Sequence, residues 1–165
     1  MIVSLRKITY EELTKQLNKE KDVIALWTCN LCIKLCETGG AEVAENLATK
    51  LKDEGYNVIH TEVLGYSCHL GLVRDRTRDP MTKPIFEEAN TIIVLTCTDG
   101  FEKVERLFRK KKVIQVTETI GIGAYSSKTG MRLVNPYPET KLPASVKGTA
   151  LKEAAKKLDM YVDPM

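Results

Sequence analysis

The chain has 165 residues, of which 43% are hydrophobic and 28% are charged. This length suits one domain with its own core, and the composition is that of an ordinary globular protein. The formal net charge of +3 is small. It does not indicate nucleic-acid binding, which usually accompanies a strong basic excess on one face.

Neither a secretory signal nor a membrane span is expected from the sequence. Residues 1–7 do not combine a basic stretch with an apolar run of about 7–15 residues. The apolar run at 92–95 is far shorter than the roughly 18 residues that predict a membrane helix. We therefore expect a cytoplasmic protein without a membrane partner, in which cysteines stay reduced.

Helix and strand patterns alternate along the first part of the chain. Thr9 and Glu12 form a capping-box signal for a short helix. The pattern at 66–80 is irregular and charged, so no element is expected there. The other expected elements are strands at 23–27, 58–64, 91–95 and 112–116, and helices at 40–55, 82–88 and 101–108.

This alternation predicts the class of fold. Continuous apolar strands that alternate with helices are typical of a parallel sheet covered on both faces. We expect a single α/β domain over 1–165, with a three-layer Rossmann-like fold and a mostly parallel sheet of about four or five strands. Glycines and prolines at 119–143 indicate hairpins and loops, and a final helix is expected at about 149–160.

The distribution of the five cysteines is the most informative feature of the sequence. They lie at the ends of the first three strands of the expected sheet or in the loops that follow. They are Cys29, Cys32, Cys36, Cys68 and Cys97. Because ligands of open α/β sheets bind beyond the carboxyl ends of the strands, we expect these thiols to converge at one edge.

Thiols in this pattern predict a metal site. Thiolates bind zinc as a tetrahedral set, or they bind an iron–sulfur cluster. Structural zinc sites typically use two separated Cys-x2-Cys pairs or add histidine. Here a close trio is joined by distant single cysteines, and the only histidines are His60 and His69. The spacing favours one [4Fe-4S] cluster over zinc, with Cys32, Cys36 and Cys68 as the leading ligands and Cys29 or Cys97 as the fourth.

Two other interpretations of the cysteines stay open. Buried cysteine behaves as a small hydrophobe, so Cys29 and Cys97 are also compatible with plain strand core. A redox dithiol at Cys29 and Cys32 would require a lowered thiol pKa, and it would not account for Cys36 or Cys68.

Other motifs are weaker. Thr38-Gly39-Gly40 before a helix could offer backbone N–H groups to an anion. The glycines are explained more simply as letting the cysteine loop turn closely around a metal. We find no catalytic set, since neither histidine lies beside a nucleophile motif.

The cysteine segments resemble a known family. The resemblance is carried by Cys29-x2-Cys32-x3-Cys36-Glu-Thr-Gly-Gly40, by Ser67-Cys68 and by Leu95-Thr-Cys97-Thr-Asp-Gly100. The chain is similar, over about residues 20–118, to the small cysteine-rich subunit or C-terminal domain of methylenetetrahydrofolate reductases. A second cysteine-rich segment of that family has no counterpart here, because 119–165 contains no cysteine.

The resemblance implies a function. It implies an iron–sulfur accessory or electron-transfer protein with a single [4Fe-4S] cluster, in pterin-linked one-carbon metabolism. Its partner would be a flavin-containing methylenetetrahydrofolate reductase-like subunit or a methyltransferase subunit. The chain itself would be a non-catalytic subunit of an oxidoreductase complex, with a homo-oligomer also compatible. The alternative is a zinc-binding, non-redox scaffold subunit of a methyl-transfer or reductase complex.

Overall fold

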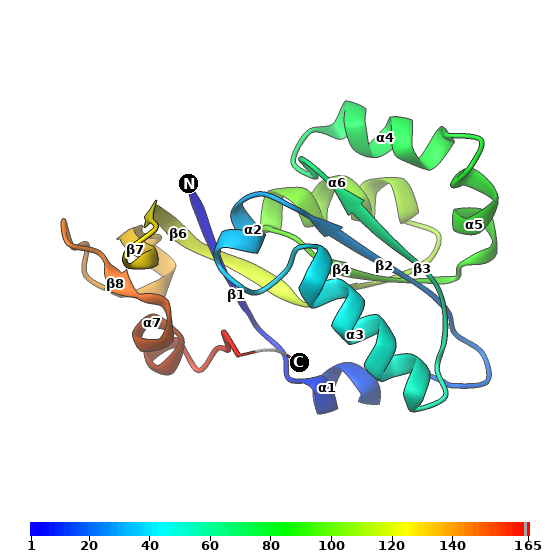
Figure 1. Cartoon of the computed structure of the whole chain (residues 1–165), viewed down its shortest axis with the longest axis horizontal. Helices are drawn as coiled ribbons and strands as arrows, with labels where there is room; N and C mark the ends of the chain where they lie inside the picture. Colours follow the sequence, from blue (N-terminus) through cyan, green and yellow to red (C-terminus); the bar gives the residue numbers. More distant parts are fainter. Residues whose placement is uncertain (164) are drawn as a thin grey trace.

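The computed structural model describes residues 1–163 and 165 and contains two four-stranded sheets (Figure 1). One sheet is parallel, in the order β3-β2-β4-β5. Its strands are β2 (Val23–Cys29), β3 (Asn57–Leu64), β4 (Thr91–Leu95) and β5 (Lys112–Gln115). The mixed α/β class with a parallel sheet is therefore confirmed. The other sheet is antiparallel and was not predicted.

The strand order creates a switch point in the parallel sheet. The chain passes from β2 to β3 on one side, and then returns across β2 to form β4 on the other side. Connections therefore leave β2 and β4 in opposite directions. In open α/β sheets, the crevice beyond the carboxyl ends of two such strands is where ligands bind.

Helices pack on both faces of the parallel sheet. One face is covered by α1 (Tyr10–Lys15) and α3 (Ala41–Asp53). The other face carries α4 (Leu70–Arg78), α5 (Lys83–Glu88) and α6 (Thr98–Phe108). The capping box of α1 is present as predicted, with the Glu12 N–H donating to Thr9 Oγ1 at 3.1 Å.

Trp27 lies at the centre of the second face. Its side chain is fully buried, and its ring centroid lies 5.4 Å from that of Phe86 and 6.0 Å from that of Phe108. Aromatic pairs at such distances add to the stabilisation from area burial. The helices α5 and α6 are thereby anchored to the strand that ends at Cys29.

The expectation that 66–80 has no element is wrong, because α4 lies there. Val73 is its one buried residue, so no apolar stripe marked this helix in the sequence. Polar contacts hold it instead. The Arg76 Nε–H donates to Glu62 Oε1 at 2.8 Å, and His69 Nδ1 accepts from the Leu72 N–H at 3.3 Å.

The antiparallel sheet joins the first residues of the chain to its later part. Its order is β1-β6-β7-β8, and its strands are β1 (Ile2–Arg6), β6 (Thr117–Ser126), β7 (Gly130–Pro136) and β8 (Thr149–Ala150). The β6–β7 hairpin occupies most of the segment where hairpins and loops were expected. The helix α7 (Leu151–Leu158) packs on this sheet through Leu151, Ala154 and Ala155.

The two sheets are joined beside the end of β4. The Thr98 N–H donates to Thr119 Oγ1 at 3.0 Å, and the Thr119 N–H donates to Thr98 Oγ1 at 2.9 Å. In addition, Thr117 Oγ1 donates to the Thr96 carbonyl. Across residues 1–163 and 165, no helix has the length and apolarity needed to cross a membrane.

Candidate metal centre

Two cysteines flank the switch point of the parallel sheet. Cys29 is the last residue of β2, and Cys97 follows β4 directly as the N-cap of α6. The strands are neighbours, with Thr28 paired to Leu95. Cys29 and Cys97 are therefore placed at the two sides of the crevice where the topology predicts a ligand.

The loop after β2 carries two more cysteines and is tightly fastened. It contains the short helix α2 (Cys32–Leu35), which Cys36 ends as the C-cap. Thr28 Oγ1 donates to the Leu95 carbonyl at 2.9 Å and accepts from the Gly40 N–H at 2.9 Å. One buried hydroxyl thus joins both ends of the loop to β4.

Gly39 explains part of this packing. A Cβ atom at this position would lie 2.6 Å from Ile33 Cγ1 and 3.0 Å from the Leu95 carbonyl oxygen. The backbone therefore approaches β4 more closely than any side chain allows. This agrees with the interpretation that the glycine pair lets the cysteine loop turn closely.

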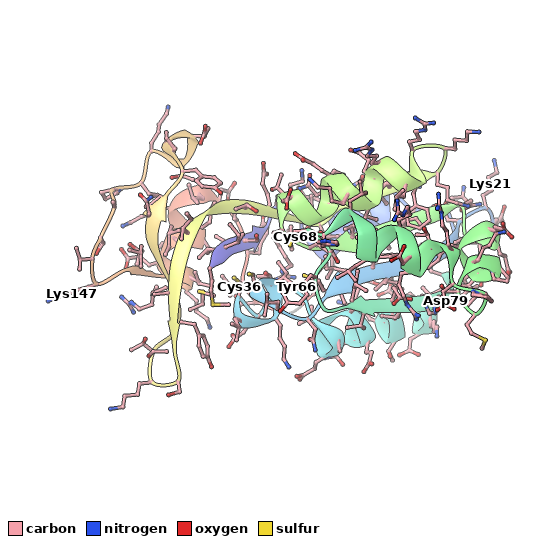
Figure 2. All side chains as sticks on the ribbon, turned by 90° about the horizontal axis from the view of Figure 1, so that it is seen from above. Lys21, Cys36, Tyr66, Cys68, Asp79 and Lys147 are labelled. Atoms are coloured by element: carbon pink, nitrogen blue, oxygen red, sulfur yellow. The ribbon has the colours of Figure 1, made fainter. Side chains whose placement is uncertain are left out.

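Cys68 comes from the loop that follows β3. The Trp27 indole N–H donates to Ser67 Oγ at 3.0 Å within the core, which holds this loop against β2. Cys68 itself is exposed, unlike Ser67. Figure 2 shows Cys36, Tyr66 and Cys68 near the middle of the long axis of the molecule.

Electrostatic interactions show that the thiols are close to one another. Burial raises the pKa of Cys29, and the neighbouring Cys32 and Cys68 raise it further. Burial also raises the pKa of Cys97 to about 11, with contributions from Cys29 and Cys68. Cys29 is therefore within electrostatic range of Cys32 and Cys68, and Cys97 within range of Cys29 and Cys68. Cys36 interacts in the same way with Cys32 and Cys97.

Backbone donors are aimed at the buried sulfurs of this group. The Gly100 N–H donates to Cys97 Sγ at 3.4 Å, in the first turn of α6. The backbone N–H groups of Leu31 and Ser67 interact with Cys29 and act to lower its pKa, against the effect of burial. Such donors stabilise a thiolate, which is the form that binds metal.

Cys36 has a different environment. It is fully buried and belongs to the core of the antiparallel sheet. Its Sγ donates to the Ile2 carbonyl at 3.8 Å, and nearby Thr38 Oγ1 donates to the Ser4 carbonyl at 3.0 Å. Burial raises the pKa of Cys36 to about 11. This thiol fastens the cysteine loop to β1, and Cys32 and Cys97 also act on it to raise its pKa.

Thiols are suitable ligands for a metal, but in this structure their side chains are too far apart to share one. Within 1–163 and 165, no three Cys, His, Asp or Glu side chains are grouped closely enough to hold a metal ion as they stand. Cys32 is partly exposed and Cys68 is exposed, whereas Cys29 and Cys97 are buried. Gly65, before Cys68, has open space around it.

The histidines lie outside this group of sulfurs. The Nδ1 atom of His69 caps α4, and His60 Nε2 lies 3.0 Å from Glu62 Oε2. Neither histidine is among the groups that act on Cys29 or Cys97, so sulfur ligands are the ones that the strand ends offer. The raised pKa of Cys29 also disfavours a redox dithiol with Cys32, because that chemistry needs a thiolate near neutral pH.

The structure adds a cavity of about 530 Å³ beside Cys97, between α6 and the antiparallel sheet. Asp99, Glu118 and Glu139 are among its lining residues, together with an apolar floor that includes Ile120. No local sequence pattern indicates this cavity, because its walls come from α6, β1, β6, the segment after β7 and the end of α7.

No family model matches this sequence, and no curated protein or solved structure is similar enough to count as a match.

Proposed function

We propose that this protein binds a single [4Fe-4S] cluster through its cysteines and acts as an accessory or electron-transfer subunit. The observation that carries the proposal is that three separate loops place cysteines beside the switch point of a parallel sheet, where Cys29 and Cys97 influence each other and Cys68 acts on both. Helices on both faces of that sheet also support a Rossmann-like three-layer class for this half of the molecule.

We assign Cys29, Cys32, Cys68 and Cys97 as the four ligands of the cluster. The sequence had favoured Cys36 over Cys29 or Cys97. Its burial against β1 and its bond to the Ile2 carbonyl support a structural role for this fifth thiol.

The cluster would supply one-electron redox chemistry, and the chain would set its potential. N–H donors to ligand sulfur and burial are the two means by which proteins tune such centres. The Gly100 N–H at Cys97 is such a donor, and those of Leu31 and Ser67 act on Cys29. Cys68 faces solvent and gives electrons a short path to the surface.

The partner we propose is a flavin-containing methylenetetrahydrofolate reductase-like subunit or a methyltransferase subunit, as the resemblance implies. Exposed apolar side chains near the thiols support docking at this edge. Leu31 is 38% exposed, Tyr66 is 52% exposed and Leu72 is 41% exposed. In this role the chain is a non-catalytic, cytoplasmic subunit of an oxidoreductase complex.

The test is anaerobic purification followed by iron, zinc and acid-labile sulfide analysis. We expect a brown protein with about four irons and four sulfides per chain. The Cys→Ser variants at 29, 32, 68 and 97 should each lose most of the iron. Cys36→Ser is the matched control and should keep it.

Other outcomes contradict the proposal. A colourless protein with one zinc per chain would replace it with the zinc scaffold, in which the same thiols form a tetrahedral, non-redox site. A protein that stays metal-free after anaerobic reconstitution with iron and sulfide, and also after incubation with Zn²⁺, would exclude both. Iron loss in Cys36→Ser without loss in Cys29→Ser would overturn the ligand assignment alone.

A further inference from the structure

A second cavity lies at the other end of β1 from the cysteine loop. Its volume is about 260 Å³, and its walls include Arg6, Thr9, Tyr10, Lys50 and Tyr161. Figure 1 shows β1, α1 and the C-terminal end of the chain meeting in this region. None of these residues takes part in the thiol site.

Arg6 is the unusual member of this wall. Its side chain is only 4% exposed, yet its Nε atom has no hydrogen-bond partner among residues 1–163 and 165. No carboxylate of the described chain lies within ion-pair distance of it. Burial lowers the pKa of Arg6, and only Asp163 opposes this effect. A buried Nε–H without a partner on a largely buried guanidinium is unfavourable, which indicates that an anion belongs beside it.

Two further groups reinforce this requirement. The Lys50 ammonium lies 3.8 Å from the centroid of the Tyr10 ring, and no ion pair of Lys50 is found in the described part of the chain. The Tyr10 hydroxyl is buried and makes no hydrogen bond within 3.5 Å among the described residues, although Glu54 is near enough to act on it as an acceptor. Burial and the nearby Glu54 raise the pKa of Tyr10, so its hydroxyl stays protonated and can donate.

The carboxylates of Glu11 and Asp163, which line the cavity, do not serve as the anionic partner of Arg6. Glu11 is exposed on the first turn of α1. The Asp163 side chain is 80% exposed, and its Oδ1 lies 3.5 Å from Lys152 Nζ. An exposed pair contributes little, and neither carboxylate lies within 4.0 Å of the Arg6 guanidinium in the described chain.

We propose that this cavity binds a small oxyanion, the phosphate or carboxylate group of a small molecule, through Arg6. Tyr10 and Lys50 supply the further donor and the second positive charge. The volume of about 260 Å³ lies below the roughly 300–1,000 Å³ of pockets for drug-sized ligands, which favours a compact anion. Arginine suits this ligand because its planar fork matches oxyanion geometry.

The test uses inorganic phosphate and acetate as probes on the full chain, with chloride at equal ionic strength as reference. Binding is measured by calorimetry and by the rise in melting temperature. We expect a response to at least one of the two oxyanions, and their comparison identifies the preferred group. Arg6→Met should weaken binding by tenfold or more, and Tyr10→Phe by a smaller factor. The exposed Arg78→Met is the matched control and should bind like the wild type.

Stability measured without oxyanion separates this role from a purely structural one. Arg6→Met removes an unpaired buried cation, so it should be at least as stable as the wild type in chloride and should gain nothing from phosphate. If Arg6→Met does not fold, Lys50→Met and Tyr10→Phe must show the weakened binding. The proposal is overturned if the wild type responds to neither oxyanion, or if Arg6→Met or both substitute variants bind as the wild type does.

Discussion

At the scale of single residues, Cys36 and Cys97 make the metal-free protein sensitive to alkali. Burial raises the pKa of each thiol from 9.0 to about 11. The folded state therefore keeps protons that the unfolded chain loses above pH 9. This stabilisation is complete below pH 9 and is lost as pH rises through 11.

We expect the free energy of unfolding to fall by about 2 kcal/mol per thiol between pH 8 and pH 11. Urea titrations of the reduced, metal-free protein at pH 8 and pH 11 measure the change. A Cys36→Ala/Cys97→Ala double variant is the control, because other titrating groups remain in it. An equal loss of stability in both proteins would contradict the expectation.

Thr38 is the second residue whose contribution can be isolated. It is fully buried, and its hydroxyl donates to the Ser4 carbonyl. Thr38→Val keeps the shape and leaves that carbonyl without its donor, so we expect a loss of about 1–3 kcal/mol. Denaturant unfolding measures it, with the exposed Thr49→Val as control. A loss no larger than that of the control would show that the bond contributes nothing.

The next scale is that of whole elements, where α4 depends on one buried carboxylate. Glu62 is 3% exposed and accepts from the Arg76 Nε–H at 2.8 Å. Arg76→Met leaves Glu62 with His60 alone and should cost roughly 2 kcal/mol, as expected for a hydrogen bond to a charged group.

Hydrogen exchange resolves where this loss occurs. Amides of α4 should lose protection in Arg76→Met, while those of β4 should change less, because few apolar contacts hold α4 in place. Arg78→Met, on the same helix, is the control. Uniform loss of protection over both elements would mean that Arg76 stabilises the whole fold instead.

The elements also show what could be predicted from sequence. The strand at 91–95 was placed correctly, because its five residues are all buried and apolar or β-branched. α4 was missed because its stability comes from Arg76 and Glu62, which no local pattern links. β1 was missed because it is short and its pairing partner β6 is remote in sequence.

The candidate site also has a part that could be predicted from the sequence and a part that could not. Placing Cys29 and Cys97 at one edge required only the strand ends and the parallel order. The separate environment of Cys36 depends on β1, whose Ile2 carbonyl accepts from the thiol. It could not be foreseen without that strand. The cavity beside Cys97 escaped prediction for a related reason, since its walls come from distant segments.

For the whole molecule, the hydrogen bonds that link the two sheets predict that both sheets unfold together. The reciprocal bonds of Thr98 and Thr119 and the contact of Cys36 with β1 are partly or fully buried. Separating the sheets would expose them, so we expect one transition. Fluorescence of Trp27, the single tryptophan, reports on the parallel sheet, and hydrogen exchange of β7 reports on the other. Distinct midpoints for the two probes would show that the sheets unfold independently.

The pairing of β1 with β6 also bears on how fast the chain folds. Ile2 faces Ile122 across the ladder, so this contact closes a loop of 120 residues, from 2 to 122. Contacts of such long sequence separation form slowly, because closing the loop costs chain entropy before the favourable energy of the contact can offset it. The strands of the parallel sheet are closer together in the sequence and can pair earlier. The hydrogen bonds from Cys36 to the Ile2 carbonyl and from Thr38 to the Ser4 carbonyl form only after β1 has paired with β6. We expect this docking to limit the refolding rate.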